Sequence, residues 1–156
     1  MQSVRKEVVV EAPLERAFRV FTDKYDKWWP REHHIGKADL ESAVMEPREG
    51  GRWYEIGVDG SECDWGKVLV WDPPKRVLLA WNLNADWEYD PSLTTEVEVS
   101  FIPVGPMKTR VVLEHRYMER FGEKAAQTRE GLDSEQGWAM HLGLFAKAVE
   151  RELATA

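Results

Sequence analysis

Apolar residues near the end of the chain recur at helical spacing. Five of them follow one another at intervals of four, three, four and four residues: Trp138, Leu142, Phe145, Val149 and Leu153. Side chains at this spacing lie on one face of a helix, and such an apolar face must be buried. Asp133 stands where an N-cap is expected, with Gln136 as its capping-box partner. The pattern therefore predicts one long helix over residues 133–153.

The middle of the chain has a different pattern, in which apolar and polar residues alternate with a period of two. Residues 95–101 show it most clearly, because Val97, Val99 and Phe101 alternate with Glu96, Glu98 and Ser100. Asp59-Gly60 is a strong hairpin signal between two such segments, which should pair. Together with a β-branched segment near the start, the alternation predicts strands at 4–11, 39–45, 52–58, 63–71, 77–81, 95–101 and 109–117.

Two short helices are expected between the first two strands, at residues 14–21 and 25–29, with Pro13 at the first turn of the first one. Residues 31–37, 82–93 and 122–131 are expected to be loops. This order predicts an α+β protein in which a curved antiparallel sheet of about six to seven strands holds a long C-terminal helix against its apolar face. A curved sheet that grips one helix leaves space between the two near the ends.

Composition narrows the class of protein. The 156 residues fit a single domain, 1–156, that can bury a core without disulfides. A net charge of −7 without dense runs of Lys or Arg argues against a nucleic-acid partner. Cys63 is the single cysteine and no stretch reaches the ~20 apolar residues of a membrane span. We therefore expect a soluble, cytoplasmic protein.

Several short motifs, taken in order, resemble a known family. Residues 8–13 (VVVEAP), 20–23 (VFTD) and 28–30 (WWP) resemble the opening of the START-like (SRPBCC) superfamily, which has the helix-grip fold. Further motifs resemble one bacterial branch of this superfamily. That branch is similar to the C-terminal domain of the activator of the ninety-kilodalton heat-shock chaperone ATPase. The matching motifs are 46–52 (EPREGGR), 65–68 (WGKV), 72–74 (DPP), Trp81, 96–99 (EVEV), 113–115 (LEH) and 137–138 (GW).

The resemblance implies a cavity under the long helix. Members of the superfamily bind lipids, sterols, polyketides or plant hormones there, some members are cyclases, and the eukaryotic namesake stimulates a chaperone. It supplies no catalytic residue that can be carried over to this chain, since the matched glycines and prolines belong to turns. Analogy of fold alone does not define a site.

Aromatic residues are the main candidates for a ligand site, because the chain has eight Trp, four Tyr and five Phe. Those near loops and strand ends could line an apolar pocket that favours a flat, ring-bearing ligand, whereas those at core spacing are mainly structural. The predicted ligand-binding residues are Trp28, Trp29, Trp53, Trp81, Trp87, His115, Trp138 and His141.

The histidines leave alternatives open. His115 shares a strand face with Val111 and Leu113, so it should point inward, either to bind or protonate a ligand or as a core histidine with protein partners. His33 and His34 lie in a loop, where a rim role is favoured over a metal site. We predict no metal, cofactor or catalytic residue.

The leading hypothesis is therefore binding of a small, largely apolar or aromatic molecule between the C-terminal helix and the sheet. Two alternatives stay open: a module that interacts with a heat-shock chaperone, and a cyclase- or hydrolase-like enzyme that uses His115. A homodimer is possible.

Overall fold

The computed structural model describes residues 1–154, and side chains as far as Glu152. Seven strands form one antiparallel sheet in the order β1-β7-β6-β5-β4-β3-β2. Their bounds are β1 (Val4–Val10), β2 (Leu40–Met45), β3 (Arg52–Gly57), β4 (Glu62–Asp72), β5 (Arg76–Trp81), β6 (Thr95–Gly105) and β7 (Lys108–Arg116). The helices are α1 (Leu14–Thr22), α2 (Tyr25–Trp28), the 3-10 helix η1 (Met118–Lys124), α3 (Ala125–Asp133) and α4 (Trp138–Ala154).

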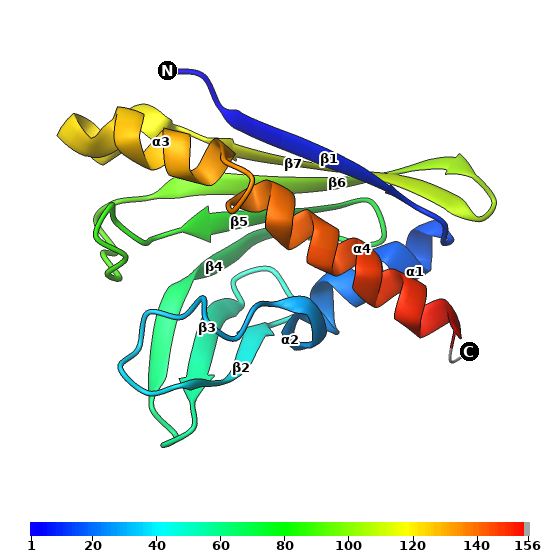
Figure 1. Cartoon of the computed structure of the whole chain (residues 1–156), viewed down its shortest axis with the longest axis horizontal. Coiled ribbons are helices and arrows are strands. Elements are labelled where there is room, and N and C mark those ends of the chain that lie inside the picture. Colours follow the sequence, from blue (N-terminus) through cyan, green and yellow to red (C-terminus); the bar gives the residue numbers. More distant parts are fainter. Residues whose placement is uncertain (155–156) are drawn as a thin grey trace.

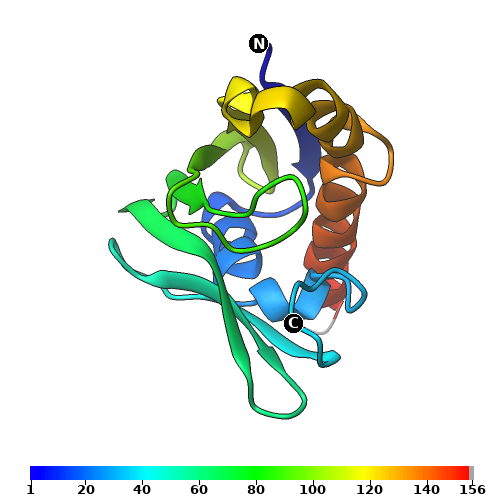
Figure 2. The same ribbon diagram turned by 90° about the vertical axis from the view of Figure 1, so that its left-hand side faces the viewer.

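The sheet curls around α4, which crosses its concave face (Figures 1 and 2). The inward residues of β6 are buried as the alternation predicted: Val97, Val99 and Phe101. β3 and β4 pair across the predicted Asp59-Gly60 turn, where Gly60 takes a positive φ of 85°. The predicted α+β helix-grip architecture is confirmed.

The apolar face of α4 packs against the sheet and the two short helices. Trp138, Leu142, Phe145 and Val149 are all buried, as the spacing predicted, while the side chain of Leu153 lies outside the described residues. Phe145 meets Phe21 of α1 edge to face, with 5.3 Å between ring centroids. No helix within residues 1–154 has the length and apolar character needed to cross a membrane.

The predicted long helix is α4, but its predicted start at Asp133 was wrong. Asp133 is the last residue of α3 and not an N-cap, and its carboxylate pairs with Lys6 of β1 at 2.9 Å. Ser134 is extended and α4 begins only at Trp138. Gly137 allows this close junction, because a Cβ there would lie 2.3 Å from the backbone oxygen of Leu132. Spacing of apolar residues does not reveal such a contact.

Two smaller predictions also need correction. Residues 122–131 were expected to be a loop, but most of them belong to α3, which buries only Ala125 and Leu132 and so has too sparse an apolar pattern to be recognised. The last strand was predicted to extend to Tyr117. β7 instead ends at Arg116, because Tyr117 takes a left-handed φ of 71°, and its ring lies under the Arg120 guanidinium.

Candidate functional site

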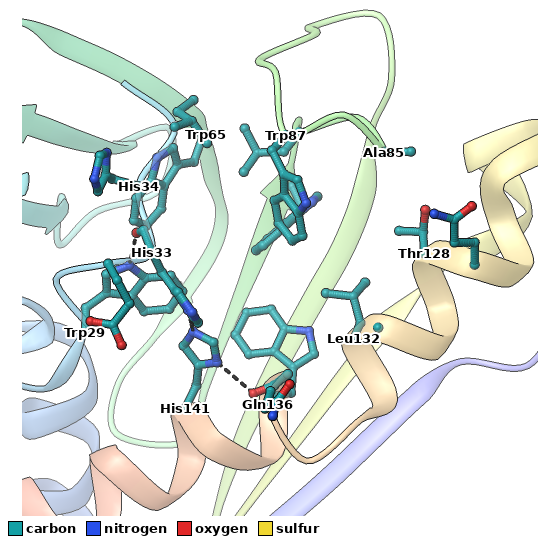
Figure 3. A pocket seen from close by; sticks show the side chains of 18 residues that line it. Trp29, His33, His34, Trp65, Ala85, Trp87, Thr128, Leu132, Gln136 and His141 are labelled. Carbon is teal, nitrogen blue, oxygen red and sulfur yellow. Dashed lines mark hydrogen bonds between the residues drawn. The ribbon is translucent and has the colours of Figure 1, made fainter. Parts of the chain in front are cut away.

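A cavity of about 480 Å³ opens at the end of the sheet where α3 meets α4 (Figure 3). Its walls come from the α2–β2 loop, β4, β5, the β5–β6 loop, α3 and the start of α4. The lining residues are Trp29, Glu32, His33, His34, Ile35, Trp65, Trp81, Leu83, Ala85, Trp87, Gln127, Thr128, Gly131, Leu132, Gln136, Gly137, Trp138 and His141.

Five indole rings make up much of this wall, and they contact one another in a series. Trp65 and Trp29 lie 5.1 Å apart between ring centroids, and Trp29 and Trp138 lie 6.4 Å apart. Trp138 meets Trp81 at 5.5 Å, and Trp81 meets Trp87 at 6.1 Å. Four of these rings are buried, whereas Trp87 is 53% exposed. The cavity therefore has a rigid aromatic floor and one accessible ring at its mouth.

The β5–β6 loop holds Trp87 over the cavity. Asn84 Oδ1 accepts hydrogen bonds from the backbone amides of Asp86 and Glu88, which closes a compact turn. Trp87 lies in this turn with a positive φ of 61°. The Asp86 carboxylate also pairs with Lys124 of η1 at 2.6 Å, so the loop is tied to the helical wall opposite the sheet.

His33 and His141 come together inside the cavity although they are 108 residues apart in the chain. Their rings share a hydrogen bond of 2.8 Å between His33 Nδ1 and His141 Nε2, and the rings lie close together in Figure 3. His141 Nδ1 donates to the backbone oxygen of Gly137 at 2.8 Å. Burial lowers the pKa of His141 to about 4, so this imidazole is neutral near neutral pH.

A buried carboxylate fixes the loop that carries His33. Glu55 of β3 is 1% exposed, and its carboxylate accepts the backbone amides of Ile35 at 2.6 Å and Gly36 at 3.1 Å. It also accepts the indole N–H of Trp65 at 2.8 Å, which orients a ring of the aromatic wall. The backbone oxygen of His33 accepts the indole N–H of Trp29 at 2.8 Å. Loop and wall are therefore held as one unit.

His115 points inward, as predicted, but both of its ring nitrogens are bonded within the core. Trp138 Nε1 donates to His115 Nδ1 at 3.1 Å, so the proton must be on Nε2, which donates to Thr95 Oγ1 at 2.8 Å. The ring is completely buried, and this burial lowers its pKa to about 3. The geometry fits the core interpretation of His115, whose partners are protein groups.

The structure places five of the eight predicted ligand-binding residues in the cavity lining: Trp29, Trp81, Trp87, Trp138 and His141. Trp28 packs into the core and donates to the backbone oxygen of Val20, while Trp53 is buried behind Trp65. Neither of these, nor His115, lines the cavity. Ligand binding by these eight residues stays a prediction.

Sequence reasoning missed part of the lining. Trp65 meets the criterion of an aromatic residue near a strand end that selected the other tryptophans, so it could have been found. Gln127 and Thr128 could not, because they belong to the unpredicted α3. His33, expected at the rim, does line the cavity. Within residues 1–154, no group of three or more His, Cys, Asp or Glu is placed to hold a metal ion.

Comparison with protein families matches residues 11–150 to the family described as activator of Hsp90 ATPase homolog 1-like protein. The chain belongs to this family. The resemblance seen in the short motifs is thereby confirmed, and the match spans nearly all of the described elements. A search among curated proteins finds no match.

Solved structures of similar chains include two that are more than 30% identical. An anthrahydroquino-γ-pyrone synthase, Txn09, complexed with SUM, is 38% identical, with a TM-score of 0.66 over 95% of this chain and 97% of that one. CalC, a self-sacrificing resistance protein from Micromonospora echinospora, is 33% identical, with a TM-score of 0.71 over 96% and 95%. The Aha1 dimer from Colwellia psychrerythraea, 19% identical with a TM-score of 0.63 over 96% and 97%, shares the fold.

Proposed function

We propose that this protein binds a flat, mostly apolar molecule with fused aromatic rings in the cavity between α4, α3 and the sheet. The observation that carries the proposal is the continuous series of five indole rings, Trp65, Trp29, Trp138, Trp81 and Trp87, around a cavity of about 480 Å³. Ligand sites are typically concave, about 300–1,000 Å³ in volume and mainly apolar, with a few polar groups.

The interactions that the cavity can make favour an aromatic ligand over an aliphatic one. An aromatic ligand gains from burial of its surface, and each offset or edge-to-face contact with an indole adds about 0.5–1.5 kcal/mol. The cavity also carries the carboxylate of Glu32 and no lysine or arginine in its lining. An anionic ligand such as a fatty acid would therefore lack a counter-charge.

The name of one similar protein supports the same class of ligand. Txn09 is named as a synthase of an anthrahydroquino-γ-pyrone, a fused-ring molecule, and it is 38% identical to this chain over 95% of its length. Binding is the part of the function that the cavity supports directly.

The test is a titration of 15N-labelled protein with 2-methoxynaphthalene, a neutral fused-ring probe, followed through the indole N–H signals of the eight tryptophans. We expect the signals of the five cavity tryptophans to shift, while that of Trp71 stays unchanged. Trp71 is a suitable reference because it packs against Phe18, and neither residue belongs to the cavity lining. Equal shifts at Trp71, or none in the cavity, would refute the proposal.

A matched pair of variants sharpens the test. Trp87→Asn removes the exposed ring, and Asn tolerates the positive φ at this position. Loss of one aromatic contact should weaken binding by about 2–12-fold, which corresponds to about 0.5–1.5 kcal/mol. Tyr89→Asn is the control, because Tyr89 lies in the same loop with 40% exposure but outside the lining. Equal affinities of the two variants would argue against a role for Trp87.

The other predictions have less support. Interaction with a heat-shock chaperone stays a prediction that rests on the family, and chaperone ATPase activity measured with and without the protein would test it. A homodimer also stays a prediction, since the dimeric neighbour at 19% identity shows the fold alone. Both nitrogens of the His115 ring are bonded in the core, which argues against an enzyme that uses this ring as an acid or base.

A further inference from the structure

One ring nitrogen of the histidine pair is left for a ligand. His141 Nδ1 donates to the backbone oxygen of Gly137, so the neutral His141 ring has a lone pair on Nε2. That lone pair must accept the hydrogen bond of 2.8 Å from His33, so the donor is the Nδ1–H group of His33. The lone pair on His33 Nε2 then remains, and this atom makes no hydrogen bond to any of the described residues.

The packing of His33 and His141 fixes the orientation of this lone pair. The His141 ring lies 4.5 Å from Trp29 and 5.5 Å from Trp138 between centroids, which prevents it from turning. His33 is held through its ring by His141 and through its backbone by Trp29. Both histidines line the cavity. The burial that keeps His141 neutral, with a pKa of about 4, also keeps its Nε2 an acceptor.

We propose that His33 Nε2 accepts a hydrogen bond from an aromatic hydroxyl group, so that the ligand class of this cavity is a neutral phenol with fused rings. His141 is a positioning residue, since it acts through His33. This inference rests on the proposed function, because it names a polar group on the same aromatic ligand.

Two neighbouring groups could compete for such a hydroxyl group. His34 Nδ1 bonds the backbone oxygen of Gly36, and its ring is turned to the far side of the loop from His33 in Figure 3. Glu32 lines the mouth of the cavity but is exposed to water, which satisfies its carboxylate without a ligand. Of these candidates, His33 alone is held by a second ring of the cavity wall. Glu32 and His34 are therefore the matched controls.

The experiment compares 2-naphthol with 2-methoxynaphthalene, in which a methyl group replaces the hydroxyl hydrogen and so removes the hydrogen-bond donor. Wild-type protein should bind 2-naphthol more tightly by about 2–12-fold, the range expected from one hydrogen bond worth about 0.5–1.5 kcal/mol. His33→Phe and His141→Phe should abolish this preference while 2-methoxynaphthalene still binds. His34→Phe and Glu32→Gln change other residues of the same lining, so each should alter the affinity for both probes alike and leave the preference intact.

The outcomes separate the inference from the proposed function. If both probes bind but wild-type protein shows no preference, or if His33→Phe keeps the preference, the inference fails and aromatic binding stands. If neither probe binds, both fail. A preference that His34→Phe or Glu32→Gln abolishes instead would assign the hydroxyl group to another residue and overturn the role of His33.

A second measurement uses the wild-type protein and does not depend on the folding of a variant. Long-range 1H–15N spectra distinguish a ring nitrogen that carries a proton from one that does not. In the free protein we expect Nδ1 of His33 to carry the proton and Nε2 to be unprotonated. Addition of 2-naphthol should shift the Nε2 signal toward the protonated range, and 2-methoxynaphthalene should not. An Nε2 signal that is indifferent to 2-naphthol would overturn the proposal.

Discussion

Gly137 is the position at which one added methyl group should disrupt the junction between α3 and α4. In Gly137→Ala the new Cβ would lie 2.3 Å from the backbone oxygen of Leu132 and 2.7 Å from that of Gly131. Both obstacles are backbone atoms at the end of α3, so they cannot rotate away as a side chain would. Gly143, on the exposed side of α4, has no atom within 4 Å of the same ideal Cβ and is the matched control.

The two substitutions should change stability in opposite directions. Overpacking of this kind costs about 1–3 kcal/mol, because one segment must move. Gly143→Ala should instead stabilise by about 0.5–1 kcal/mol, since glycine inside a helix loses more conformational entropy than alanine. For a chain of this size, 1 kcal/mol corresponds to about 2–4 °C in Tm. We therefore expect Gly137→Ala to lower Tm by roughly 2–12 °C and Gly143→Ala to raise it by roughly 1–4 °C.

Thermal and urea unfolding followed by far-ultraviolet circular dichroism would measure both effects. An unchanged urea m-value would show that the variants differ in stability and not in the compactness of either state. If Gly137→Ala proved as stable as Gly143→Ala, the close contact between Gly137 and Leu132 would be refuted. Because the Gly137 carbonyl also fixes the tautomer of His141, a displaced junction should weaken the preference for 2-naphthol as well.

Two further predictions concern buried polar groups. Burial lowers the pKa of His115 from 6.5 to about 3 and that of His141 to about 4, so the folded state disfavours the protonated rings. Their contribution to stability is complete above pH 6.5 and is lost as the pH falls toward these values, by up to about 1.4 kcal/mol per pH unit for each ring. A urea midpoint that stayed constant between pH 6.5 and 4 would contradict this. Glu55→Gln replaces a carboxylate that accepts three N–H groups with a side chain that has one acceptor oxygen. This variant should lower the free energy of unfolding in urea by about 1–3 kcal/mol. The control Glu49→Gln, at an exposed position, should change it by less than about 0.5 kcal/mol. Equal midpoints for the two variants would show that Glu55 does not hold the loop.

Most of the secondary structure could be predicted from the sequence because its signals are local. Alternation with a period of two located the strands, and the Asp59-Gly60 turn fixed which two would pair. The apolar spacing of residues 138–149 identified the buried face of α4, where Trp138, Phe145 and Val149 all lie in the core. Short motifs then identified the family, which the match over residues 11–150 confirms.

The misplaced start of the long helix shows which contacts local sequence patterns do not report. Residues 133–136 carry polar side chains compatible with a capped helix, so the pattern placed Asp133 at an N-cap. In the folded chain the Asp133 carboxylate meets Lys6 of β1 instead, and Gly137 packs against the end of α3. Both contacts join elements whose relative positions are set only when the sheet and helices assemble.

The sequence by itself determined the order of the seven strands and of α1, α2 and α4, and the face that each of these buries, because such patterns depend on neighbours within one or two turns of chain. Its composition also showed the surplus of indole rings. Only the tertiary structure decided which of the candidate rings face the cavity: Trp81 and Trp87 line it, while Trp53 lies behind the wall. It also decided the pairing of His33 with His141 across 108 residues, because a hydrogen bond between distant segments depends on how the curved sheet positions a loop against a helix.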